Sequence, residues 1–176
     1  MGRKRETFWY ALKVFYNRVE PIRKIFKDAR YDTYIPMIVE EEYCGNGLDY
    51  KEKPAVASLL FVCYPRKFLL DVKKEFNDMF LYYTKPGENL PAIIDDREME
   101  IFRKATELAG MGAEYLGSDT AKYCVGDKVR VTAGIYEGLE GYIKRIKHAR
   151  KFIVSIEGVA VVALTGIHPQ YLEKIE

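Results

Sequence analysis

The side chains that most often carry out chemistry in proteins are sparse in this sequence of 176 residues. Its two histidines, His148 and His168, are not spaced with a cysteine, a carboxylate or each other in a metal-ligand pattern. The three cysteines, Cys44, Cys63 and Cys124, are far apart and form no C-x-x-C pair. Catalysis at neutral pH usually needs an activated nucleophile, a tuned acid and base, or a metal. The sequence therefore predicts that the protein is not an enzyme and has no metal site, catalytic residue or cofactor.

Two other patterns could carry chemistry but have simpler explanations. Asp95-Asp96 could form a paired carboxylate, yet Glu98 follows Asp95 at the spacing of a helix capping box, which accounts for both acidic positions. Gly45-Asn46-Gly47 could cradle a phosphate, yet Asn-Gly between two extended arms is typical of a hairpin turn. These residues are interpreted as structural.

Charge is nearly balanced over the whole chain but segregated along it. The net charge is +2, from 28 basic and 26 acidic side chains. Residues 1–30 hold nine basic and three acidic residues, whereas residues 31–60 hold two and six, and residues 61–120 hold eight and eleven. Residues 121–176 are basic again, with nine against six. This distribution suggests a polyanion near the N-terminal segment, although a solvated helix face would produce much of it.

The composition describes a globular chain with room for one domain or two small ones, because 48% of the residues are hydrophobic and 31% are charged. The longest apolar runs fall far short of the roughly 20 residues that a membrane helix needs. No secretory signal is visible, and three isolated cysteines suit a reducing compartment. A cytoplasmic location is therefore expected.

The N-terminal part alternates between patterns of period two and patterns of helical period. We expect strands at Phe8–Phe15, Val56–Tyr64 and Met79–Tyr83, a hairpin from Tyr34 to Lys53, and helices from Val19 to about Arg30, from Lys67 to Phe76, and from Asp95 to Ala109. The third helix has an apolar stripe at Met99, Phe102, Ala105 or Thr106, and Ala109. Val56–Tyr64 is apolar on both faces, which is typical of a central strand with packing on each side.

The C-terminal part has no helical period and instead shows short β runs at Lys128–Thr132, Gly141–Lys147, Phe152–Ile156 and Val159–Leu164. Many short strands in so few residues favour a small barrel. The segment from Gly110 to Thr120 before them has the composition of a linker. We therefore predict a first domain over residues 1–110, a linker over 111–123 and a barrel domain over 124–176.

A resemblance to known proteins begins in this barrel. The segment from Val125 to Gly141, VGDKVRVTAGIYEGLEG, is similar to a KOW motif, the strand–loop–strand signature of SH3-like barrels in transcription elongation factors and some ribosomal proteins. Its glycines permit a tight loop, and its apolar residues alternate toward a barrel core.

The rest of the chain makes this resemblance more specific. Trp9-Tyr10 opens a strand, a charged hairpin follows, and the segment from Ala92 to Met99, AIIDDREM, opens the last helix. This order, ahead of a linker and a KOW unit, resembles a NusG-type transcription elongation factor over nearly the whole chain. The sequence differs at Ala57-Ser58-Leu59-Leu60, where the general factor has Pro-Gly-Tyr-Val. The ending from Gly158 to Ile175 is similar to specialised paralogues of the UpxY type, which act as antiterminators at capsular polysaccharide operons.

The resemblance implies an α+β fold: an antiparallel sheet flanked by helices (an NGN-like domain), followed by an all-β SH3-like barrel (KOW). It implies a factor that binds the bacterial RNA polymerase elongation complex at the clamp helices of the β′ subunit, reaches toward the β subunit, and suppresses pausing and termination. It also implies contact with the non-template DNA strand of the transcription bubble, and a KOW partner such as ribosomal protein S10 or termination factor Rho.

Carried onto this sequence, the resemblance implies three sets of residues. The candidates for RNA polymerase binding are Trp9, Tyr10, Leu59, Phe61, Leu81 and Tyr83. Those for nucleic-acid binding are Arg18, Arg23, Lys24 and Lys27. Those for a KOW partner are Ile135 and Tyr136, which could instead close the end of the barrel. Because neighbours in a strand point to opposite faces, Trp9 and Tyr10 are not expected to share one role.

Three functions remain open from the sequence. The first is an antitermination and processivity factor for particular operons, and the second is a general NusG elongation factor. The third is an RNA-binding or ribosome-associated KOW protein that does not contact polymerase.

Overall fold

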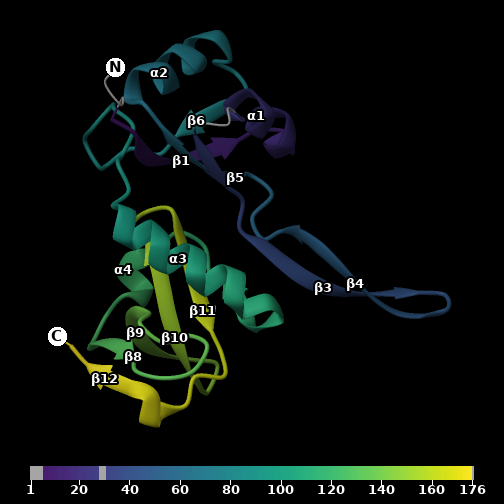
Figure 1. Cartoon of the computed structure of the whole chain (residues 1–176), viewed down its shortest axis with the longest axis vertical. Helices are drawn as coiled ribbons and strands as arrows, with labels where there is room; N and C mark the ends of the chain where they lie inside the picture. Colours follow the sequence, from purple (N-terminus) through teal and green to yellow (C-terminus); the bar gives the residue numbers. More distant parts are fainter. Residues whose placement is uncertain (1–5, 28–30, 176) are drawn as a thin grey trace, which may run out of the picture. The chain divides into compact units, whose positions relative to one another are not determined.

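The computed structural model describes residues 6–27 and 31–175 of the chain (Figure 1). These residues form two compact units. The first contains residues up to 35 together with 56–96, and the second contains residues 36–55 together with 97 to the C-terminus. None of the described helices is long and apolar enough to cross a membrane.

The first unit is built on a four-stranded antiparallel sheet with the strand order β2-β5-β1-β6. Its strands are β1 Phe8–Val14, β2 Asp32–Tyr34, β5 Leu59–Tyr64 and β6 Phe80–Tyr82. The central pair joins β1 to β5 along six residues, from Phe8 opposite Tyr64 to Lys13 opposite Leu59. The long apolar run near the middle of the sequence is therefore an interior strand, as its composition predicted.

Two helices, α1 Val19–Phe26 and α2 Arg66–Glu75, pack on one face of this sheet (Figure 1). Alternate residues of β1 point into the same apolar cluster as the buried residues of both helices. Phe26 of α1 meets Phe80 of β6 edge-on, with ring centroids 5.9 Å apart. The core of the first unit consists of Tyr10, Leu12, Val14, Val19, Ile22, Phe26, Ile35, Leu60, Val62, Tyr64, Leu69 and Phe80.

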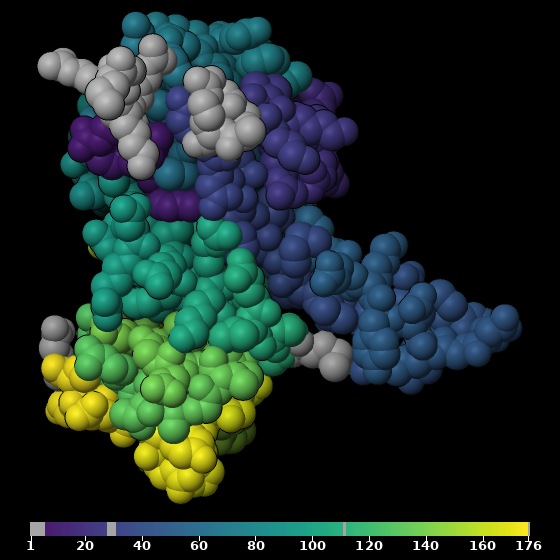
Figure 2. All heavy atoms as spheres, viewed as in Figure 1, coloured from purple at the N-terminus to yellow at the C-terminus, as the bar shows by residue number. Residues whose placement is uncertain are grey.

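The second unit begins with a two-stranded hairpin, β3 Met37–Cys44 and β4 Gly47–Pro54. Cys44 lies opposite Gly47, so the turn consists of Gly45 and Asn46 as the sequence indicated. Every residue from 40 to 53 is exposed, and the space-filling view shows that the hairpin is narrow (Figure 2). The hairpin has no apolar interior of its own.

The rest of the second unit is a six-stranded antiparallel sheet in the order β12-β8-β9-β10-β11-β7. The strands are β7 Ala113–Tyr115, β8 Lys128–Val131, β9 Glu140–Ile146, β10 Ala149–Ile156, β11 Ala160–Leu164 and β12 Leu172–Lys174. Short helical turns lie at η1 Gly110–Gly112, α4 Thr120–Tyr123 and η2 Pro169–Tyr171. The α+β class with a small all-β barrel is confirmed.

The segment interpreted as a linker contains an ordered strand. Within it, β7 pairs with β11 along three residues, from Ala113 opposite Leu164 to Tyr115 opposite Val162. The backbone nitrogen of Leu116 donates to the oxygen of Val161 at 2.9 Å, and a carboxylate–lysine contact joins Glu114 to Lys151 of β10. This part of the chain is held in the barrel sheet rather than extended as a free tether.

Helix α3, Asp96–Ala109, contacts the barrel (Figure 1). Lys104 of α3 donates from Nζ to the backbone oxygen of Glu137, and the carboxylate of Glu98 accepts from the backbone nitrogen of Glu157 at 3.0 Å. The stripe predicted for this helix is buried, including both Ala105 and Thr106. These contacts group α3 with the barrel, whereas the sequence interpretation grouped it with the N-terminal sheet. The exact domain boundaries stay a prediction.

Candidate interaction surfaces

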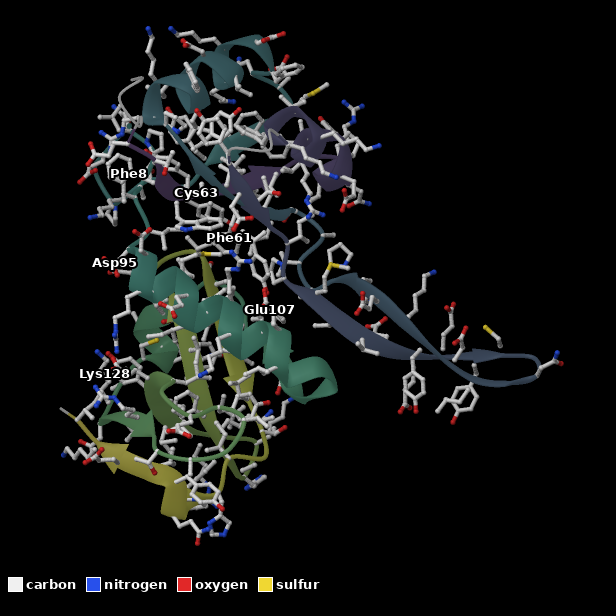
Figure 3. All side chains as sticks on the ribbon, in the orientation of Figure 1. Phe8, Phe61, Cys63, Asp95, Glu107 and Lys128 are labelled. Carbon is white, nitrogen blue, oxygen red and sulfur yellow. The ribbon has the colours of Figure 1, made fainter. Side chains whose placement is uncertain are left out.

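The first candidate surface is the face of the N-terminal sheet opposite α1 and α2. In the strand register, Trp9 lies opposite Cys63, while Lys13 lies opposite both Leu59 and Leu81. Because facing residues share a side of a sheet, this register places Trp9, Leu59, Phe61 and Leu81 on one face (Figure 3 labels Phe61 and Cys63). Tyr83 continues the same alternation, and its backbone nitrogen donates to the oxygen of Ala11 at 3.0 Å.

Tyr10 lies on the other face, which corrects its assignment to this surface. It is fully buried and belongs to the apolar cluster under α1 and α2. Burial raises the pKa of its hydroxyl, and the nearby positive charge of Arg66 offsets part of that effect. Tyr10 is therefore a core residue. The alternation of side chains along a strand predicts that Tyr10 and Trp9 lie on opposite faces of the sheet. It does not predict which of the two faces the helices cover.

The five predicted residues on this face, hereafter the second sheet face, differ in accessibility, and the register places the exposed Lys13 among them. Trp9, Leu59 and Phe61 are buried in the structure. Leu81 of β6 is 49% exposed, and Tyr83 is half-buried, with a pKa raised by its burial. A partner can therefore reach the surface directly at β6, whereas contact with the other three requires them to become accessible.

The four predicted nucleic-acid-binding residues lie on or beside α1. Lys24 and Lys27 are exposed, and Arg18 is exposed with its guanidinium 5.5 Å from the centre of the Tyr16 ring. Arg23 is more constrained, because its Nε donates to Oγ1 of Thr33 in β2 at 3.1 Å and it pairs with Glu20 at 3.4 Å. Three of the four side chains are thus accessible cations, and the fourth also ties α1 to the sheet.

The two predicted KOW-partner residues separate in the structure. Ile135 is 66% exposed, whereas Tyr136 is only 8% exposed and has a pKa raised by its burial. The loop that carries them is closed by backbone hydrogen bonds, including Gly138 to Val131 at 2.8 Å. Tyr136 is thus buried, as expected if it closes the end of the barrel, and of these two residues only Ile135 is exposed.

One basic cluster was not selected from the sequence. Lys144, Arg145, Lys147, His148, Arg150 and Lys151 fall within eight residues, at the end of the β9–β10 hairpin. The composition of this run was visible, but the pairing of its residues across two strands depends on the register of the barrel. Across the residues that the structure describes, no group of histidines, cysteines and carboxylates could hold a metal.

Comparison with known proteins gives a match at the level of structure alone. No model of a protein family matches the sequence, and no curated protein does. Among solved structures, the chain is similar to NusG of Thermotoga maritima, from work described as "Domain interaction in Thermotoga maritima NusG". The TM-score is 0.51, with 20% sequence identity over 97% of this chain and 98% of that one. The chain has a NusG-type fold.

This likeness covers the N-terminal sheet as well as the barrel, because almost the full length of each chain is aligned. It confirms the NusG-type fold recognised from the sequence. At 20% identity it extends to the fold only.

Proposed function

We propose that the chain is a transcription elongation factor that binds bacterial RNA polymerase and suppresses pausing and termination. The observation that carries this proposal is the second sheet face. Four of its residues align through the strand register into one apolar surface that is not packed by α1 or α2, on a chain with a NusG-type fold. Trp9, Leu59 and Phe61 are buried in the structure, so a protein partner would first meet this face at Leu81 of β6, a large apolar side chain that is 49% exposed.

The proposed partner of this face is the pair of clamp helices in the β′ subunit, with the β subunit across the cleft. Trp9 and Phe61 are the kind of large aromatic side chains that dominate the energy of protein interfaces. By holding the clamp closed, the factor favours the elongating conformation of the polymerase over the paused and terminating ones. This is a shift between populations and needs no bond-making group on the factor.

Two further contacts complete the proposal. The exposed cations Arg18, Lys24 and Lys27 suit the phosphates of the non-template DNA strand, which they would bind without reading sequence. Ile135, at the exposed tip of its loop, suits a protein partner such as ribosomal protein S10 or Rho. A role at capsular polysaccharide operons is supported by the resemblance of the C-terminal segment to UpxY-type antiterminators.

Binding to polymerase can be tested with core enzyme and Leu81→Glu. This residue is exposed, so a charge there should lower affinity by about tenfold without unfolding the sheet. The matched control is Leu108→Glu, because Leu108 is a comparably exposed leucine on α3. Equal affinities of the two variants and wild type would remove the second sheet face from the proposal. In a separate co-purification experiment, recovery of ribosomal RNA in place of polymerase would favour a ribosome-associated KOW protein.

The regulatory part of the proposal needs a transcription assay in vitro with the same polymerase. One template carries a capsule-operon leader with its terminator, and the other carries an unrelated terminator. Relief of termination on the first template alone supports a specialised antiterminator. Relief on both supports a general elongation factor, and relief on neither contradicts the proposed activity.

The DNA contact is tested by Lys24→Glu with Lys27→Glu, measured as binding to a transcription bubble over a range of salt concentrations. Lys67→Glu with Lys85→Glu removes the same charge from exposed positions outside α1. Loss of affinity and a shallower salt dependence in the first pair alone support the contact. Identical behaviour of the two pairs contradicts it.

A further inference from the structure

The end of the β9–β10 hairpin brings like charges together across two strands. Arg145 lies directly opposite Arg150, and Lys144 lies directly opposite Lys151. Side chains at facing positions of an antiparallel pair have Cβ atoms about 4.5–5.5 Å apart, and like charges there destabilise the pair. Two such pairs in succession oppose the folding of this hairpin rather than support it.

Among the residues that the structure describes, an acidic partner contacts one of the two pairs, through Lys151. Glu114 of β7 contacts Lys151 through its carboxylate and approaches Lys147, Nζ to Oε1, at 3.9 Å. Arg145 and Arg150 are both exposed, and no ion pair joins either of them to another residue in the described part of the chain. The arginine pair therefore keeps two uncompensated guanidinium groups side by side on the same face of the hairpin.

The turn between the strands adds to this charge at a conformational cost. Lys147 and His148 have φ angles of +47° and +70°, in the left-handed region where Gly or Asn is favoured. Asn-Gly would close the same turn with less strain. Instead, a lysine and a histidine are exposed at the tip.

We infer that this hairpin end is a binding site for the phosphodiester backbone of a nucleic acid strand. Paired guanidinium groups bind phosphate oxygens with two parallel hydrogen bonds each, and an anion between Arg145 and Arg150 removes their mutual repulsion. Lys147 and His148 at the tip contact the next phosphate along the strand. The site holds the backbone and does not select bases.

The surroundings favour a nucleic acid over a membrane surface. Binding to a bilayer normally combines basic residues with large apolar side chains that enter the interface. No large apolar side chain between Lys144 and Lys151 is exposed, since Ile146 is half-buried in the barrel. The site lies in the second unit, whereas α1 belongs to the first, so it consists of other residues than the DNA contact proposed above.

The test uses the full chain labelled with ¹⁵N, and single-stranded RNA and DNA oligonucleotides of the same sequence as probes. The amide signals of residues 144–151 should shift on addition of the RNA and on addition of the DNA, even if the two differ in affinity. Fluorescence anisotropy then gives the binding constant of each oligonucleotide over a range of salt concentrations. The double variant Arg145→Ala with Arg150→Ala should make the plot of log binding constant against log salt concentration less steep by about 1.4. Each lost phosphate contact on a single strand accounts for about 0.7 of this change.

Two variant pairs act as controls. Lys67→Ala with Lys85→Ala removes the same charge from exposed positions in the first unit and should leave the hairpin shifts unchanged. Arg145→Lys with Arg150→Lys keeps the charge but loses the planar fork, and its affinity should fall between wild type and the alanine pair.

Several results would overturn the site. The first is binding of an oligonucleotide to the chain without any shift of the amide signals of residues 144–151. Another is an alanine pair whose affinity and salt slope equal those of wild type. Inorganic phosphate is the third probe: if it shifts these amides at the same concentration as the oligonucleotides do, the site takes a free anion and not a nucleic acid strand.

Discussion

The guanidinium of Arg97 donates a hydrogen bond from Nη2 to Oε1 of Glu140 at 2.7 Å, joining the first turn of α3 to the start of β9. Glu140 also accepts from Nη2 of Arg130 at 2.8 Å, and Nζ of Lys128 lies 3.8 Å from its second oxygen (Figure 3 labels Lys128). The carboxylate is only 10% exposed, whereas both arginines reach solvent. One largely buried acid therefore joins α3, β8 and β9.

Replacing this acid should destabilise the chain in a pH-dependent way. Hydrogen bonds from Arg130, and then from Arg97, hold the pKa of Glu140 below its ordinary value of 4.5. A lowered pKa in the folded state means that the stabilisation is present above the ordinary value and is lost as the pH falls below it. Glu140→Gln should cost about 1–2 kcal/mol near neutral pH, and the difference from wild type should shrink below about pH 4.5.

Urea unfolding of both proteins over a series of pH values measures this effect. Glu137→Gln, an exposed neighbour in the same barrel, is the control and should have a small effect on the free energy of unfolding. A constant difference between Glu140→Gln and wild type down to acid pH would show that the ion pairs do not carry the stabilisation.

Two adjacent residues of β6 should respond very differently to truncation. Phe80 is fully buried in the core beneath α1 and α2, while Leu81 points to the second sheet face and is 49% exposed. Phe80→Ala should therefore cost about 3–5 kcal/mol of unfolding free energy, and Leu81→Ala less than about 1 kcal/mol. Chemical denaturation measures both. Similar losses would mean that the two faces of β6 are equally packed.

The second sheet face shows how far the sequence alone could go. Period two in β1 separated Trp9 from Tyr10, and the resemblance named Leu59 and Phe61, which the register places on the same face as Trp9. The period of the strands could not show which of their two faces packs against α1 and α2. Both faces are apolar, and nothing in the sequence indicates what covers each of them. The same limit applies to Ile135 and Tyr136, since a loop has no period from which to read burial.

Long-range pairing accounts for the other differences. The stripe on α3 was predicted from helical spacing, but that spacing does not say which part of the chain the stripe packs against. The glycine-rich segment before the barrel reads locally as a linker, yet Ala113–Tyr115 forms β7 by pairing with β11, which follows it by more than forty residues. Composition reports local preference, and this strand exists because of its distant partner.

Gly141 of the KOW-like segment should not tolerate any side chain. A methyl group there would lie 2.2 Å from the backbone oxygen of Ile153 and 2.9 Å from the ring of Phe152, so β9 and β10 would have to separate. Gly141→Ala should cost about 3 kcal/mol or more. The control is Gly45→Ala in the β3–β4 turn, where nothing lies within 4 Å and the change should be small. Equal melting temperatures for the two variants would contradict this account of the motif.

Stability should also fall at alkaline pH, because burial raises the pKa of Tyr10, Tyr83 and Tyr136 above the ordinary value of 10.0. A raised pKa means that the contribution of each group is complete below the ordinary value and is lost as the pH rises toward the folded-state value, since the unfolded chain releases its proton first.

Removing one such hydroxyl, in Tyr136→Phe, should make the decline in unfolding free energy above about pH 10 less steep. Tyr43→Phe is the matched control, because Tyr43 is 86% exposed. Urea unfolding between about pH 8 and pH 11, with tyrosinate absorbance followed in parallel, measures both slopes. If Tyr136→Phe and Tyr43→Phe decline in parallel with wild type, burial of Tyr136 has no influence on its ionisation.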